Sequence, residues 1–228
     1  MNGKDILKRI YPSVVTYNGD WRKMMAEVRN LGLKEISLFL TAAGYLERKK
    51  IYSALAKTKV KKIYHVHLRH DMRESELDFL VKHYQTKVFT SHYQYLDRFK
   101  SSKHIKQIFI ETNGPFDWVK NSRSLNKVGG ICVDLSHIQH FKNHYPVDYK
   151  IAKNLAKEFK VGCNHLSAVL PNGKSWHRVE KLSDLDYVKN IPQFYFSSYI
   201  NLELVNSITQ QLQFKKYLAK ILAQAWKK

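Results

Sequence analysis

Eight short runs rich in β-branched and aromatic residues recur along the whole chain, each followed by a more polar segment. Such runs are typical of strands, and polar segments with apolar residues at helical spacing are typical of helices packed on a sheet. The candidate strands are PSVVTY (12–17), EISLFL (35–40), KIYHVHL (62–68), KVFTSH (87–92), QIFIET (107–112), GICVDLSH (130–137), VGCNHLSAV (161–169) and YINLELV (199–205). The clearest candidate helices cover 20–32, 74–84, 148–159 and 208–226. This alternation predicts an α/β protein with a parallel sheet.

The number of units favours one of two α/β architectures. Eight strand–helix units in 228 residues predict a compact (β/α)8 TIM barrel. An open doubly wound sheet is the alternative, but it usually carries a GxGxxG loop after its first strand, which this chain lacks. No Pro- or Ser-rich linker divides the chain. We therefore expect a single TIM-barrel domain over residues 1–228.

The composition predicts a globular protein without a membrane span. Hydrophobic residues make up 44% of the chain, and no run approaches the roughly 18 to 20 apolar residues that cross a bilayer. The N-terminal stretch lacks the long apolar segment of a secretory signal. Cys132 and Cys163 both lie inside apolar runs. We expect no disulfide scaffold, no membrane partner and a cytoplasmic location.

The charge of the chain is strongly positive. It has 39 Lys and Arg against 19 Asp and Glu, a formal net charge of +20. Lysines are spread throughout, as in LERKKIYSALAKTKVKK (46–62), which is typical of solvated outer faces of helices. The same charge would also suit a phosphate-rich partner such as nucleic acid. The sequence leaves both interpretations open.

Side chains that can bind a metal stand at the carboxyl ends of six successive candidate strands, the third to the eighth. They are His67, His92, Glu111, Asp134 with His137, His165 and Glu203. In a parallel barrel these strand ends form one rim, where active sites lie. Carboxylates and neutral imidazoles without a thiolate are ligands for ions such as Mn²⁺, Zn²⁺, Fe²⁺ or Co²⁺. Although Asp134 alone would be explained as a helix cap, the joint arrangement predicts a shared metal site.

Strand parity predicts what lies beneath this rim. Residues two apart on a strand face the same side, so Cys132 accompanies Asp134 and Cys163 accompanies His165. The two cysteines should therefore point into the barrel, one layer below the candidate ligands. We interpret them as small core residues and not as ligands or redox groups.

The order of these residues resembles the xylose isomerase-like TIM barrels, a superfamily of sugar (phosphate) isomerases and epimerases that also includes endonuclease IV. The likeness spans about residues 11–210 as a pattern of spaced motifs. In the ketose epimerase and hydroxypyruvate isomerase branch, one metal is bound by a Glu, an Asp, a His and a Glu from the last four strands. The resemblance implies that these ligands are Glu111 in FIETNG, Asp134 in CVDLSH, His165 in CNHLS and Glu203 in NLELV.

Two further motifs resemble this branch. His137 matches the substrate-side histidine of the family's DxxH motif. The segment HRVEKLSDLDYVKNIP (177–192) is similar to the family's H-x-P-L-G-x-G stretch, although its glycines are replaced here. The resemblance implies that His137, Arg178, Asp117 and His177 are candidate substrate-binding residues.

The chain also resembles endonuclease IV, which uses additional histidines. His67 and His92 could join Glu111 on one ion, with Glu111 bridging to the ion held by Asp134, His165 and Glu203. His137 and His177 could hold a third ion. That third site normally also takes an Asp two residues before the final His, and here this position is Ser175.

The resemblance implies two enzymatic functions. The first is a sugar or sugar-phosphate isomerase or epimerase that needs a divalent ion (Mn, Zn, Co or Mg, its number open), in which Glu111 and Glu203 are the catalytic proton acceptor and donor. The alternative is an endonuclease IV-like, zinc-dependent phosphodiesterase that acts on abasic-site DNA. A barrel that keeps the ligands as a binding or regulatory protein remains a third class. A small sugar partner is expected first and nucleic acid second.

Overall fold

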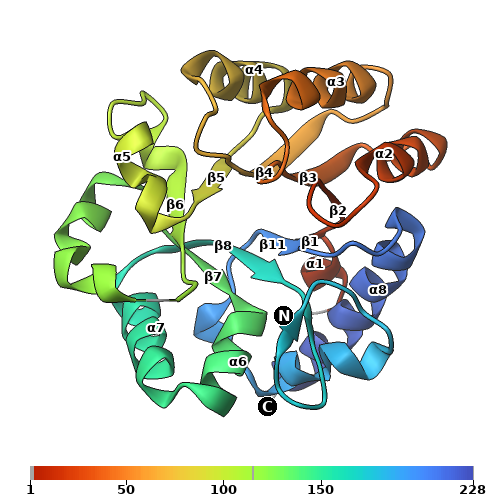
Figure 1. Ribbon diagram of the computed structural model, residues 1–228. Coiled ribbons are helices and arrows are strands. Elements are labelled where there is room, and N and C mark those ends of the chain that lie inside the picture. Colours follow the sequence, from red (N-terminus) through yellow and green to blue (C-terminus); the bar gives the residue numbers. More distant parts are fainter. Residues whose placement is uncertain (1–2, 115, 228) are drawn as a thin grey trace.

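A single sheet of parallel strands curls round until its two ends meet, with helices on its outer side (Figure 1). The computed structural model describes residues 3–114 and 116–227. The strands of this sheet are β1 (Ile10–Tyr11), β2 (Ser13–Val15), β3 (Glu35–Phe39), β4 (Lys62–His67), β5 (Val88–Ser91), β6 (Ile108–Glu111), β7 (Gly130–Asp134), β8 (Val161–Leu166) and β11 (Ile200–Leu202). Their order is β1-β11-β8-β7-β6-β5-β4-β3-β2. The predicted TIM-like barrel is confirmed.

The first predicted strand is split in two by Pro12. Because proline has no backbone N–H, it cannot continue the ladder as a donor. The residues before it pair with β11, and those after it pair with β3. The carbonyl of Pro12 still accepts a hydrogen bond from the Ser37 N–H (2.9 Å). One interrupted strand therefore joins both ends of the sheet.

Helices flank the sheet: the first precedes all of the strands, the last follows them, and the others lie between successive strands. They are α1 (Gly3–Leu7), α2 (Trp21–Asn30), α3 (Tyr45–Leu55), α4 (Glu74–Tyr84), α5 (Leu96–Phe99), α6 (Leu135–His144), α7 (Pro146–Glu158) and α8 (Ile208–Ala225). Short 3-10 helices are η1 (Tyr93–Tyr95), η2 (Ile105–Gln107), η3 (Asp117–Lys127), η4 (Leu182–Asn190) and η5 (Gln193–Tyr195). The four predicted helices match α2, α4, α7 and α8 to within about two residues at each end.

Three predicted strands, over 130–137, 161–169 and 199–205, each end three residues earlier than expected. The strand predicted over 130–137 ends at Asp134, and α6 begins at the next residue. Asp134 stops the strand because its side chain caps the helix, accepting a hydrogen bond from the His137 N–H (2.9 Å). The strand predicted over 161–169 ends at Leu166, and Ala168–Val169 (β9) instead pairs with Ser175–Trp176 (β10) as an antiparallel hairpin.

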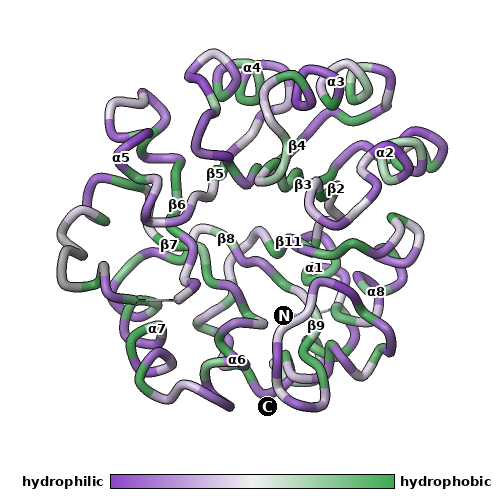
Figure 2. The backbone as a smooth tube through the Cα atoms, in the orientation of Figure 1, coloured by the Kyte–Doolittle hydropathy of each residue, from purple (hydrophilic) through white to green (hydrophobic). Residues whose placement is uncertain are grey.

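The hydrophobic core lies mostly between the sheet and the helices. In Figure 2 the helices alternate between green and purple, as expected when only one face packs inward. Inside the barrel, a small cluster forms a layer of Val88, Phe109, Cys132 and Cys163. Both cysteines are buried and free, as predicted. The Phe109 ring occupies the space where a Cβ at position 162 would stand, which explains why that position is Gly162.

No helix among the described residues is long and apolar enough to cross a membrane.

Candidate metal centre

Four side chains from successive positions around the barrel converge at the carboxyl ends of the strands. Glu111 ends β6, Asp134 ends β7, His165 lies on β8 and Glu203 directly follows β11. Each offers one ligand atom, and these atoms all lie within 4.8 Å of one another. All four residues are buried. The structure therefore brings together the four residues that the sequence analysis selected as metal ligands.

The spacing of the ligand atoms fits a shared cation. The Nδ1 atom of His165 lies 3.4 Å from Glu203 Oε2 and 3.5 Å from Glu111 Oε1. In a tetrahedral site with bonds of about 2.1 Å, neighbouring ligand atoms lie about 3.4 Å apart. His165 Nδ1, Glu203 Oε2 and Asp134 Oδ2 are buried and have no hydrogen-bond partner within the described part of the chain. Buried polar atoms normally have partners, so these three fit ligands of an ion.

The electrostatics of the cluster also favour a cation. Three carboxylates are buried here beside one another, and ions of like charge resist joint ionisation. Burial, together with the charges of Glu111 and Asp134, raises the pKa of Glu203 to about 8 despite the opposing effect of His165. Burial also opposes ionisation of Glu111, but His165, His67 and His92 hold its pKa well below the usual range. A bound divalent ion would stabilise all three carboxylates as anions.

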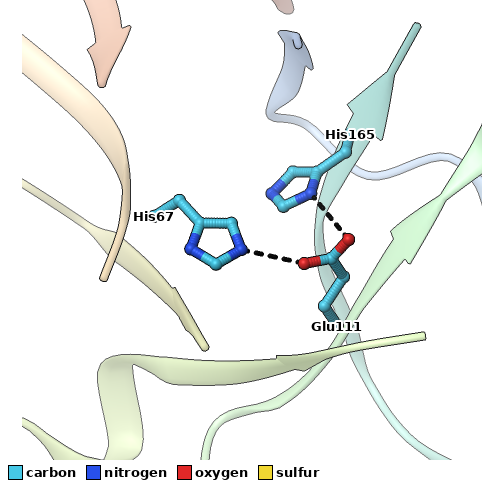
Figure 3. Close-up of side chains that lie close together, drawn as sticks. All are labelled: His67, Glu111 and His165. Carbon is cyan, nitrogen blue, oxygen red and sulfur yellow. Dashed lines mark hydrogen bonds and ion pairs between the residues drawn. The ribbon is translucent and has the colours of Figure 1, made fainter. Parts of the chain in front are cut away.

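Two more histidines contact the outer oxygen of Glu111. His67 Nε2 lies 2.8 Å from Glu111 Oε2, and His92 Nε2 lies 3.2 Å from the same oxygen. Figure 3 shows that His67 and His165 approach this carboxylate from different sides, each facing one of its two oxygens. Oε1 of Glu111 thus faces His165. Oε2 faces the imidazoles of His67 on β4 and of His92 just after β5.

Asp134 uses its two carboxylate oxygens for different contacts. Oδ1 accepts hydrogen bonds from the His137 N–H (2.9 Å) and from the Ser136 hydroxyl (2.6 Å), which itself accepts one from Ser167 (2.7 Å). Oδ2 is the atom without a hydrogen bond, and it lies 3.4 Å from Nδ1 of His137. The helix cap therefore orients Asp134 while leaving one oxygen for an ion, so the two interpretations of this residue are compatible.

His177 lies beside Glu203, and Tyr17, which was not among the predicted site residues, contacts both of them. The Tyr17 hydroxyl donates a hydrogen bond to Glu203 Oε1 (3.0 Å) and lies 3.2 Å from His177 Nδ1. Burial raises the pKa of Tyr17 well above its usual range, and Glu203 adds to this. Its position just after the first strand, at the same rim as the other strand ends, is the signal that would have identified it.

Two candidate substrate-binding residues, Arg178 and Asp117, lie outside the cluster of His, Asp and Glu side chains. Arg178 is exposed and lines a cavity of about 280 Å³ together with residues from the 18–27 and 205–210 segments. Asp117 is an exposed residue at the start of η3. Neither belongs to the converging groups of His, Asp and Glu side chains described above. Their assignment to the substrate remains a prediction.

The second ring nitrogen of His165 is held by side chains one layer deeper in the barrel. His165 Nε2 lies 3.1 Å from His65 Nε2 and 3.4 Å from Thr90 Oγ1, and these two partners lie 2.9 Å apart. All three residues are fully buried. A neutral imidazole that binds an ion through Nδ1 carries its proton on Nε2, and here that proton has nearby acceptors. His65 was not among the predicted site residues, although it shares a strand face with His67.

We expect His65→Leu to weaken Mn²⁺ or Zn²⁺ binding by about 10- to 100-fold, because residues that orient a ligand histidine typically have effects of this size. His65→Gln is the matched control, since its amide oxygen can still accept the His165 proton and should retain most of the affinity. Titration calorimetry of the metal-free protein measures both. Unchanged affinity in the Leu variant would show that Thr90 alone orients His165.

Neither a scan against protein-family models nor a search of curated proteins finds a match to this chain.

Proposed function

We propose that this protein is a divalent-metal-dependent isomerase or epimerase of a sugar or sugar phosphate. The observation that supports it is the position of two buried glutamates on either side of His165, each with an oxygen 3.4–3.5 Å from Nδ1 of that histidine. A divalent ion bound by Glu111, Asp134, His165 and Glu203 would act as the Lewis acid that polarises a substrate carbonyl. Paired carboxylates around a bound substrate are suited to proton removal at one carbon and delivery at its neighbour.

The surroundings of each glutamate suit this role. The Tyr17 hydroxyl donates a hydrogen bond to Glu203 Oε1, so Oε2 is the oxygen that faces the cluster. Glu111 is only 4% exposed, so its carboxylate is shielded from bulk water. The ring of His137 is 24% exposed and contacts substrate hydroxyl groups at the opening of the site. Each role is carried by a side chain that the strand ends hold in place.

A second candidate function is phosphodiester hydrolysis at abasic sites in DNA. It is favoured by the contacts of His67 and His92 with Glu111 Oε2, because a carboxylate with one oxygen for each of two ligand groups can bridge two metal ions. The net charge of +20 also suits a phosphate-rich substrate. Ser175 in the hairpin strand β10, at the position where a third site normally takes an Asp, weakens this alternative.

The number of bound ions and the reaction catalysed together separate these functions. Metal content per chain is measured on purified native protein, and solvent deuterium incorporation is followed by NMR in a panel of aldoses, ketoses and their phosphates. The same preparation is tested for incision of a duplex with one abasic site. One ion with deuterium exchange supports the isomerase. Two or three ions with incision would overturn it, and protein that binds no divalent ion would overturn both proposals.

A further inference from the structure

A basic groove runs between helices α2 and α3 on the outside of the barrel, and the proposed function does not use it. These two helices lie side by side in Figure 1, and a cavity of about 470 Å³ separates them. It shares no residue with the metal centre. Its lining includes Trp21 and Met25 and the cationic residues Arg22, Arg29, Lys49, Lys50 and Lys57.

Half of the residues that line the groove are cationic and none is acidic. Glu47 is the nearby carboxylate, and it is already engaged by Arg22 (2.6 Å) and Lys50 (3.2 Å). Arg29, Lys49 and Lys57 have no ion-pair partner within the part of the chain that the structure describes, and all three are exposed. The groove therefore carries at least three positive charges that no described carboxylate neutralises by an ion pair.

The cations form two rows along the groove. Lys49 lies on α3, and Lys57 lies two residues beyond the end of this helix at Leu55, so the wall formed by α3 carries two cations separated along the chain. Arg22 and Arg29 are two helical turns apart on α2, a separation of about 10.5 Å. A small anion would contact only one or two of these groups. Rows of charge on both walls instead match a ligand with charges repeated along its length.

We propose that this groove binds a strand of nucleic acid through its phosphates, without reading the bases. Repeated phosphates can contact the cations on both walls of the groove, and each phosphate that is neutralised releases counterions from the nucleic acid. A membrane surface fits less well, because the apolar floor is closed: Trp21 is 7% and Met25 is 3% exposed, so neither can insert into lipid. Base stacking on Trp21 is excluded by the same burial. Binding is therefore electrostatic and independent of sequence.

The test compares two charge-reversed variants by fluorescence anisotropy with a labelled 12-nucleotide oligothymidylate. The groove variant is Arg29→Glu with Lys57→Glu. The control is Lys216→Glu with Lys220→Glu, two exposed lysines on α8 that line a different cavity. Both double variants lower the net charge equally. Circular dichroism and thermal unfolding verify that both remain folded.

We expect the groove variant to bind at least tenfold more weakly than the unmodified protein, and the control to stay within about threefold. The slope of log K against log salt is negative, and its magnitude should decrease by about 1.4 in the groove variant, because two phosphate contacts to a single strand are lost. Equal weakening in both variants would overturn the proposal in favour of a diffuse field. Absence of binding by the unmodified protein, or binding only to phosphatidylserine vesicles, would also overturn it.

Discussion

Asp134→Asn is expected to weaken divalent metal binding by at least about 100-fold, which exceeds the usual effect of losing a residue that only orients a ligand. The substitution keeps the shape of the side chain. It places either an amide group or a neutral oxygen where Oδ2, which lacks a hydrogen bond, now faces the cluster. The Oδ1 contacts with Ser136 and the His137 N–H can persist through the remaining oxygen, so the helix cap should survive.

The matched control for this experiment is Asp97→Asn. Its side chain is 92% exposed, and the same chemical change there should leave metal affinity within about twofold of the unmodified protein. Metal content after dialysis and calorimetric titration with Mn²⁺ and Zn²⁺ measure both variants. If Asp134→Asn kept full stoichiometry and affinity, Asp134 would be a helix cap only and the proposed metal centre would be wrong.

Arg48→Met is expected to lower the free energy of unfolding by about 3–5 kcal/mol, the usual effect of removing one partner of a buried ion pair. Arg48 is fully buried on α3 and donates two hydrogen bonds to Glu76 (2.8 and 2.9 Å). A third nitrogen donates to the Ala43 carbonyl and to Asp71 (both 2.8 Å). Methionine fills much of the volume but leaves the Glu76 carboxylate buried without its cation.

The pH dependence of this loss provides a second measurement. Burial works to raise the pKa of Glu76, but the hydrogen bonds and charge of Arg48 hold it below its ordinary value of 4.5. A group with a lowered folded-state pKa contributes stability above its ordinary pKa and loses it as the pH falls. The difference between the variant and the unmodified protein should therefore shrink as the pH is lowered below 4.5. Urea unfolding at pH 7 and at pH 4 measures it.

An exposed pair of the same types is the control. Arg22 and Glu47 lie 2.6 Å apart with side chains 60% and 29% exposed, and Arg22→Met should cost less than about 1 kcal/mol. Equal losses in the two variants would show that the Arg48 pair contributes no more than a surface contact. Both variants replace an arginine by a methionine. The difference between their losses therefore measures the effect of burying the ion pair and of the additional hydrogen-bond acceptors around Arg48.

The strand ends explain why much of the site was predictable. Glu111, Asp134 and His165 were selected because each closes an apolar run, and parallel strands bring their carboxyl ends to one rim. The same argument does not identify Tyr17, although it ends the first candidate strand (12–17), because a tyrosine is not among the usual ligands of these ions. His65 was missed because it lies one layer below the rim, where a histidine is indistinguishable in sequence from a core residue.

Side-chain environment was less predictable than position. The segment 46–62 reads as a solvated basic face of a helix, yet Arg48 within it is fully buried against Glu76. Its neighbours Lys49 and Lys50 do face the solvent. Helical spacing places Arg48 on the same face as Ile51 and Leu55, but the acidic partner comes from the next βα unit. Such a pairing depends on how two units pack together.

The α/β barrel and the set of His, Asp and Glu side chains at its strand ends could be predicted from the sequence alone, because strand periodicity and helix periodicity are local properties that each short segment expresses independently. The packed fold sets which oxygen of Glu111 faces which imidazole and how Asp134 divides its oxygens between a helix cap and the cluster. It also brings the cations of α2 close to those in and just beyond α3. Those arrangements depend on distances between residues remote in sequence, which are set when the barrel closes and its helices pack.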